Sequence, residues 1–368
     1  MAQNSDYRKQ LRESMLFQTE ALSKELPRPC RRFLLSIEST TSALTQLGYA
    51  RDLKTFFTFL TREYAEFADK ELTEITAKDI EKITSAHIEE YLHYLTLYYV
   101  QDGETNVRYT NDNCSKQRKL CAVRVFMNYL FKNELISSNV AALVDVPKPR
   151  EKAIVRLEID EVARLLDYVE TGKATSARQR AYNDNTRLRD LTIITLFLGT
   201  GIRVSELVGL DIDDLDFEAY AFVVTRKGGN QQILYFPDEV ADLLEEYMEH
   251  RKELKPLPGH ENALFLSLQR KRIGVRTVEI MVKKYAKQAS PLKTRISPHK
   301  LRATYATNLY NSTGDIYIVA DLLGHSDVNT TRKHYAAMNE ENRRRAAKRV
   351  VLRESAEEKK RRESEEQQ

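Results

Sequence analysis

Two prolines near the middle of the chain, Pro147 and Pro149, constrain its fold more than any other feature. Proline stops a helix and stiffens an extended segment, and the basic side chains between residues 146 and 152 suit a path along a phosphate backbone. At 368 residues the chain is long enough for two domains, each with its own core. The sequence therefore predicts two domains joined by a linker at residues 146–155.

The first half of the chain has the apolar spacing of helices. Residues 1–26 are expected to form a polar N-terminal extension, and residues 27–145 a helical domain. Ser85 is predicted to cap one helix, after which apolar residues recur on one face, at Ile88, Tyr91, Leu92 and Leu95. A later helix repeats this spacing at Leu120, Val123, Met127, Leu130 and Phe131. The polar stretch at residues 101–113 is expected to be a loop.

The second half combines helices with a short β-hairpin, so the predicted fold class is mainly α with a small sheet (α+β). A helix is expected over Ile159–Val169, a polar and mobile insertion at residues 171–185, and a further helix that ends at Gly199–Gly201. The β-type runs at residues 221–225 and 231–236 are joined by a turn-forming segment. This domain is expected to span residues 156–345, followed by a charged C-terminal tail at residues 346–368.

Charge gives weak information about the partner. The chain carries 58 Lys and Arg against 54 Asp and Glu, a net charge of +4. The basic runs Arg270–Arg272 and Arg343–Arg345 can neutralise phosphates, but a solvated surface of mixed charge is the simpler explanation of composition alone.

Cysteine usage and hydropathy exclude several classes of protein. None of the three cysteines forms a C-x-x-C pair, which argues against a zinc site or a disulfide framework. Cys114 and Cys121 are seven residues apart and are expected to be buried on one helix face. No apolar run approaches the roughly 18–20 residues that span a bilayer, and the N-terminal sequence lacks a secretory pattern. We therefore expect a cytoplasmic protein.

Four segments carry the chemistry: GTGIRVSEL at 199–207, the hairpin turn with Lys227, SPHKLRATYAT at 297–307, and LLGHSDVNTTRKHY at 322–335. Each one alone is weak evidence, because an arginine beside a glycine or an H-x-x-R pair occurs often by chance. In their order and relative spacing, from Leu157 to Tyr335, they resemble the tyrosine recombinase (phage-integrase) family, including the Xer recombinases. The helical region before the linker resembles the core-binding domain of that family less specifically.

The resemblance implies a catalytic set. Arg203 and Arg302 correspond to a pair that clamps the non-bridging oxygens of a phosphodiester, where two guanidiniums can replace metal ions. Tyr335 corresponds to the nucleophile that forms a 3′-phosphotyrosine, and His299 to its general base. The remaining positions imply a general acid, a hydrogen-bond donor to the developing charge and an acidic supporting residue, respectively Lys227, His325 and Glu206.

Such a mechanism needs neither a metal nor a nucleotide cofactor, because the covalent ester keeps the energy of the broken bond. The sequence contains no P-loop motif. The partners that the resemblance implies are double-stranded DNA with specific recombination sites and further copies of the chain, as a tetramer on two sites. A second recombinase or an accessory protein is a further expected partner, and the expected location is the nucleoid in the cytoplasm.

One spacing departs from the family. The histidine of the Gly-His motif precedes the tyrosine by nine residues in relatives, whereas His325 and Tyr335 are ten apart and His334 occupies the expected position. Tyrosine is the chemically suitable nucleophile, and no other tyrosine follows His325. We therefore expect a bulge or an altered turn before Tyr335.

Three alternatives are open at this stage. The chain can be a catalytically silent DNA-binding accessory or architectural protein of the same fold, although the complete set of catalytic residue types argues against this. It can be a type IB topoisomerase, which shares the tyrosine chemistry but exchanges no partner strands. A helical protein-binding scaffold requires every motif to be a coincidence.

Overall fold

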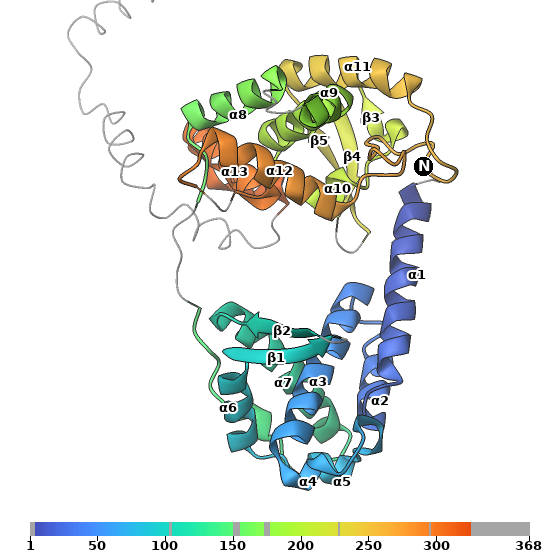
Figure 1. Ribbon diagram of the computed structural model, residues 1–368, viewed down its shortest axis with the longest axis vertical. Helices are drawn as coiled ribbons and strands as arrows, with labels where there is room; N and C mark the ends of the chain where they lie inside the picture. Colours follow the sequence, from blue (N-terminus) through green and yellow to red (C-terminus); the bar gives the residue numbers. More distant parts are fainter. Residues whose placement is uncertain are drawn as a thin grey trace, which may run out of the picture. The chain divides into compact units, whose positions relative to one another are not determined.

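The computed structural model describes residues 4–102, 105–149, 155–172, 177–226, 229–293 and 296–324. Its contacts divide the chain into two compact units, residues 2–152 and 153–368, and each unit has its own apolar core (Figure 1). Three predicted site residues, Lys227, His325 and Tyr335, lie outside the described residues, as does the tail at residues 346–368.

The first unit consists of helices and one β-hairpin. Its helices are α1 (Asn4–Ser23), α2 (Arg28–Ser36), α3 (Ala43–Glu63), α4 (Ala65–Ala68), η1 (Leu72–Glu74), α5 (Ala77–Ile80), α6 (Ser85–Tyr94), α7 (Asn113–Lys132) and η2 (Val140–Ala142). Its strands are β1 (Leu97–Asp102) and β2 (Thr105–Thr110).

Helix α3 lies at the centre of this unit, in contact with α1, α2, α6 and α7. Aromatic side chains fill the space between these helices: the ring centroids of Phe56 and Tyr91 are 5.0 Å apart, and those of Phe33 and Phe126 are 5.6 Å apart. The predicted α7 face is confirmed at Leu120, Val123, Met127 and Leu130, which are buried. It is wrong at Phe131, which is 46% exposed because the face ends one residue earlier.

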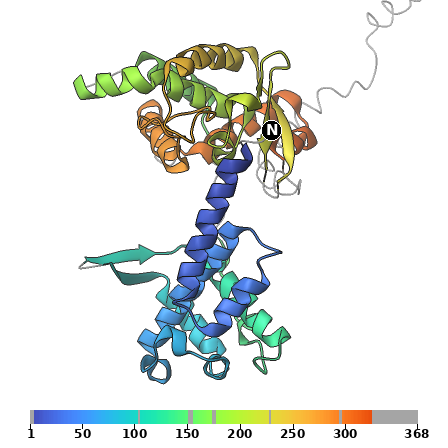
Figure 2. The same cartoon turned by 90° about the vertical axis from the view of Figure 1, so that its right-hand side faces the viewer.

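The stretch at residues 101–113 is not a simple loop. Most of it belongs to the β1–β2 hairpin, which pairs Leu97 with Thr110 and extends from the side of the helices (Figure 2). Tyr98 and Tyr109 stack across the strands with ring centroids 5.3 Å apart. Because most side chains of β2 are exposed, the strand has little apolar alternation for sequence reasoning to detect.

Two smaller predictions in this unit are wrong. The cap of α6 is Thr84, whose side chain accepts from the His87 N–H, and Ser85 is the first helical residue. Cys114 and Cys121 are exposed rather than buried, because α7 turns a different face, that of Leu120 and Val123, toward the core.

The second unit packs helices around a small antiparallel sheet. Its helices are α8 (Ile159–Thr171), α9 (Ala177–Thr200), α10 (Val204–Leu207), η3 (Ile212–Asp214), α11 (Asp238–Glu253), α12 (Val275–Ala289), α13 (Pro298–Thr313) and α14 (Ile316–Leu323). Its strands are β3 (Leu215–Asp216), β4 (Ala221–Thr225) and β5 (Gln231–Tyr235), in the order β3-β4-β5.

Helix α9 is central to the second unit and contacts α8, α11 and α13 (Figure 1). The predicted hairpin is confirmed, with Ala221 opposite Tyr235, and so is the predicted fold class of a mainly helical protein with small sheets. The insertion at residues 171–185 was expected to be mobile, but α9 begins at Ala177 and includes its second half. Burial of Asn183 and Thr186 gives this polar first part of α9 a packed side.

Within the described residues, none of the helices is both long enough and apolar enough to cross a membrane.

Candidate active site

Arg203 lies between the end of α9 and the start of α10, where a glycine sets the chain direction. Gly201 has a φ of 64°, a conformation that glycine adopts at little cost, and an added Cβ would lie 2.3 Å from Cδ1 of Tyr305. Arg203 follows as the N-cap residue of α10, with its side chain 36% exposed. This tight connection follows the buried Ile202 and leaves the Arg203 side chain partly exposed.

Glu206 holds Arg203 at two points. Its Oε1 lies 2.7 Å from Nη1 of Arg203, and its Oε2 accepts from the Arg203 backbone N–H at 2.9 Å. Glu206 is only 4% exposed, so the carboxylate is compensated by this pair and by the first turn of α10. The carboxylate therefore fixes both the backbone and the side-chain direction of the arginine.

Arg302 comes from the first turns of α13 and is 6% exposed. Its Nη1 donates to the carbonyl oxygen of Gly201 and its Nη2 to that of Leu323. Burial, followed by repulsion from Arg203, lowers the pKa of Arg302 to about 10. Since that value is well above neutral, the guanidinium keeps its charge.

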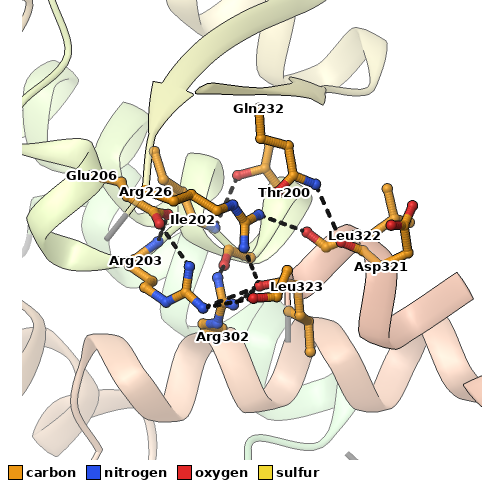
Figure 3. Close-up of polar contacts among 12 residues, drawn as sticks. Thr200, Ile202, Arg203, Glu206, Arg226, Gln232, Arg302, Asp321, Leu322 and Leu323 are labelled. Atoms are coloured by element: carbon orange, nitrogen blue, oxygen red, sulfur yellow. Dashed lines mark hydrogen bonds and ion pairs between the residues drawn. The ribbon is translucent and has the colours of Figure 1, made fainter. Parts of the chain in front are cut away.

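A third guanidinium joins these two. Arg226 follows strand β4, and its Nη1 donates to the same Leu323 carbonyl oxygen that accepts from Arg302 (Figure 3). Arg203 donates to that oxygen as well, from Nη2 at 3.3 Å. Three arginines from separate elements therefore converge on one oxygen atom.

The charge of this cluster is positive. Its three guanidiniums are near the carboxylates of Glu206 and Asp321, and burial together with repulsion from Arg203 lowers the pKa of Arg226. The carbonyl groups at the end of α14, the negative end of the helix dipole, offset part of this charge. The arrangement suits an anion with several oxygens, of which a phosphate group is one.

His299 lies in the first turn of α13, three residues before Arg302, and its side chain is exposed. A spacing of three places both residues on the same side of a helix. His299 and Arg302 therefore start from the same side of α13, and the exposed His299 side chain is accessible to solvent.

Two of the three predicted site residues outside the described part of the chain directly follow a described residue. Lys227 follows Arg226, whose backbone N–H donates to Asn230 across the hairpin turn at 2.7 Å. His325 follows Gly324, the left-handed C-cap of α14. Tyr335 is ten residues further along the chain.

Sequence reasoning missed Arg226 as part of this cluster. Arg226 stands directly before Lys227 in a turn rich in glycine, and a residue in such a turn is expected to be exposed to solvent. The decisive feature is a contact with α14, which lies about a hundred residues further along the chain, and no local pattern contains it.

The predicted phosphate-neutralising run at residues 270–272 is wrong for Arg272. This side chain is buried, pairs with the carboxylate of Asp211 and donates to the carbonyl of Leu210 at 2.8 Å. Asp211 is 2% exposed and belongs to this internal pair. The Arg272 side chain therefore stabilises the connection after α10 and does not form part of a phosphate-binding surface. Arg343–Arg345 lie outside the described residues.

No group of three or more His, Cys, Asp or Glu side chains within the described part of the chain could hold a metal ion.

Comparison with known families shows where this arrangement belongs. The model of the phage integrase family matches residues 155–342, just over half of the chain, and this range contains every predicted site residue. This chain belongs to the phage integrase family. The resemblance inferred from the four motifs is therefore confirmed.

Individual relatives agree with this family. The tyrosine recombinase XerC of Psychromonas ingrahamii is 34% identical over 215 residues, which cover 58% of this chain and 67% of that protein. XerC of Caldanaerobacter subterraneus is 32% identical over 289 residues, 77% of this chain and 75% of that protein. The Tn1549 transposon integrase in complex with a circular intermediate DNA shares the fold, with a TM-score of 0.61 at 19% identity over 86% of this chain and 98% of that one.

As a member of the phage integrase family with XerC relatives, the chain is a tyrosine-type site-specific recombinase, an enzyme that cleaves and rejoins DNA. The arginine cluster is the described part of its candidate active site. The comparisons give no support to a catalytically silent protein.

Proposed function

We propose that this recombinase breaks a DNA strand by attack of the Tyr335 hydroxyl on phosphorus. The P–O5′ bond breaks, a 3′-phosphotyrosine forms and a 5′-hydroxyl is released. The same hydroxyl, or that of a partner strand, reverses the step, so rejoining needs no ATP. The observation that supports this proposal best is the convergence of Arg203 and Arg302 on one oxygen, that of Leu323.

The roles follow from the chemistry of each group. Arg203 and Arg302 would bind the non-bridging oxygens, whose negative charge grows in the transition state, and Glu206 would keep Arg203 in position. His299 would accept the proton of Tyr335, whose ordinary pKa near 10 leaves it mostly protonated at neutral pH. Lys227 would protonate the leaving 5′-oxygen, and His325 would donate a hydrogen bond to the phosphate.

Assembly belongs to the same proposal. Exchange between two DNA sites needs one active chain for each strand that is cut, which makes four copies on two sites. We propose such a tetramer on specific double-stranded sites, in the cytoplasm with the nucleoid, with a second recombinase or an accessory protein as a further partner.

A denaturing-gel assay tests the nucleophile. The protein is incubated in EDTA with nicked duplexes. Cleavage near the nick frees a short strand that carries the 5′-hydroxyl, and once this strand has diffused away the covalent adduct cannot be reversed. We expect an adduct with the unaltered chain and none with Tyr335→Phe, which keeps the ring but lacks the attacking oxygen. The matched control is Tyr317→Phe, at an exposed tyrosine of α14, which should keep the adduct. An adduct that survives in Tyr335→Phe would place the nucleophile elsewhere.

A further inference from the structure

The β4–β5 hairpin is tied to the end of α14 by three side-chain hydrogen bonds. Arg226 donates from Nη2 to the carbonyl of Leu322 at 3.2 Å and from Nη1 to that of Leu323. Gln232, on the other strand of the hairpin, donates from Nε2 to the carbonyl of Asp321 at 3.2 Å (Figure 3). We refer to these bonds as the hairpin contact.

The hairpin contact uses carbonyl groups in the last turn of α14, of which that of Asp321 also accepts from the Gly324 N–H at 2.7 Å. The last four carbonyl groups of an α-helix have no partner within it, and the C-terminal end carries a partial negative charge. A guanidinium that donates to two successive carbonyls there makes charge-assisted bonds at two points. Arg226 is partly buried in this arrangement, and that burial lowers the pKa of its guanidinium.

Gly324 leaves the space that the contact needs. It ends α14 with a φ of 57°, and an added Cβ would lie 1.5 Å from Nη1 of Arg226. A side chain at this position would therefore meet both backbone strain and the guanidinium. The Arg226 guanidinium therefore packs directly against the glycine that ends α14.

The hairpin contact lies directly beside two residues of the proposed mechanism. Lys227 is the next residue after Arg226, and His325 is the second residue after Leu323, so in the sequence each directly follows a partner of the contact or is one residue removed from it. The two residues are almost a hundred positions apart in the sequence. The described bonds of the hairpin contact therefore join the strand that leads into Lys227 to the helix that leads toward His325.

We propose that Arg226 is a positioning residue for general-acid catalysis, which holds the hairpin against α14 so that Lys227 reaches the leaving 5′-oxygen. This inference rests on the proposed function, in particular on the role of Lys227. The alternative role for Arg226, direct binding of the phosphate, is suggested by its Nε, which is buried and has no partner among the described residues.

A substrate with sulfur in place of the bridging 5′-oxygen separates these roles. A thiolate leaves without a proton, so loss of the general acid matters little, whereas loss of a phosphate ligand slows both substrates. The experiment measures single-turnover cleavage of normal and sulfur-substituted nicked duplexes by the full chain and four variants: Arg226→Ala, Lys227→Ala, Arg203→Lys and Gln232→Ala.

We expect Arg226→Ala to cleave normal DNA roughly 10- to 100-fold more slowly, a loss no greater than the lower end of the roughly 100- to 10,000-fold that general-acid catalysis contributes, and the sulfur substrate at close to the unaltered rate. Lys227→Ala should show the same pattern with a larger loss on normal DNA. Arg203→Lys should be slow on both substrates. Gln232→Ala, which removes the weaker bond of the contact, should show a smaller loss on normal DNA that the sulfur substrate also restores.

The outcomes separate the two proposals. If sulfur restores Lys227→Ala but not Arg226→Ala, the inference is overturned and Arg226 is a phosphate ligand or a part of the fold. Full activity of Arg226→Ala on normal DNA also overturns it. If sulfur does not restore Lys227→Ala, the proposed role of Lys227 fails first. Should Arg226→Ala not fold, Arg226→Gln and Gln232→Ala carry the same test.

Discussion

Hydrogen bonds from neighbouring groups, rather than solvent, stabilise the charged side chains of the candidate site. Arg302 stays cationic although it is almost fully buried, because both of its terminal nitrogens donate to carbonyl oxygens. Arg203 depends on Glu206 for its direction. Each arginine therefore uses several donors at fixed angles, a requirement that a lysine cannot meet.

This requirement gives the first prediction, for Arg203→Lys. An ammonium group can keep the charge but cannot bond Glu206 and a phosphate oxygen at the same time from the guanidinium positions. We expect adduct formation to slow by about 100-fold or more, as for the loss of one donor to a transition state, with DNA affinity changing far less. Single-turnover cleavage and a binding isotherm measure the two effects. A cleavage rate near that of the unaltered chain would remove Arg203 from the phosphate clamp.

A second residue-scale prediction concerns Glu161 of α8 and the pH dependence of stability. Burial raises the pKa of Glu161, but its bonds with Lys293, the Glu158 N–H and Ser290 lower it more, to about 2. A lowered folded-state pKa gives stability that is present above the ordinary value of 4.5 and is lost as the pH falls toward 2. The difference corresponds to at most about 3 kcal/mol.

Calorimetric melting of Glu161→Gln across this pH range provides the measurement. The melting temperature should lie several degrees below that of the unaltered chain near neutral pH, with the gap closing as the pH falls from about 4.5 toward 2. Glu279→Gln is the control, because its pair with Arg276 is exposed and should contribute little at any pH. A gap that widens in acid would contradict the assignment.

At the scale of elements, the site depends on how α9 ends. Gly201 combines a positive φ with close contact to Tyr305, and its carbonyl accepts from Arg302. Gly259 has a similar φ of 83° but nothing within 4 Å of an added Cβ. Alanine substitutions at these two glycines therefore separate the free-energy cost of backbone strain from the cost of the contact with Tyr305.

We expect Gly259→Ala to lower the free energy of unfolding by about 1 kcal/mol, the cost of a positive φ, with cleavage unchanged. Gly201→Ala should cost more and should also slow cleavage strongly, because the Tyr305 ring or the α9–α10 connection must move with the bound Arg302. Thermal melting and the adduct assay report the two effects. Equal losses of stability and of cleavage in the two variants would mean that the contact of Gly201 with Tyr305 contributes to neither.

Elements with strong apolar periodicity were predictable, and those fixed by distant contacts were not. Helix α8 and strands β4 and β5 follow their local patterns, as does the buried face of α7. The β1–β2 hairpin was missed because its strands are largely exposed, and the start of α9 was missed because its first turns are polar. At the site, the motifs predicted Arg203, Glu206 and Arg302, whereas Arg226 joins them only through α14.

At the scale of the whole molecule, the chain has two separate cores, one on each side of the proline segment that constrained the sequence most. The family match lies in the second unit, and so do all the arginines of the cluster. The proposed chemistry therefore belongs to the second unit, while the predicted role of the first, DNA binding by a core-binding domain, stays a prediction. Cleavage through one tyrosine is the claim on which the account of the whole enzyme depends.

Mapping the protein–DNA bond tests that claim most directly. The covalent complex is trapped on a nicked duplex in EDTA, digested with nuclease and protease, and the modified peptide is sequenced by mass spectrometry. We expect a single phosphotyrosine-linked nucleotide, on Tyr335, with the DNA attached through its 3′-phosphate. A nucleotide on any other residue, or a 5′-phosphate linkage, would contradict it.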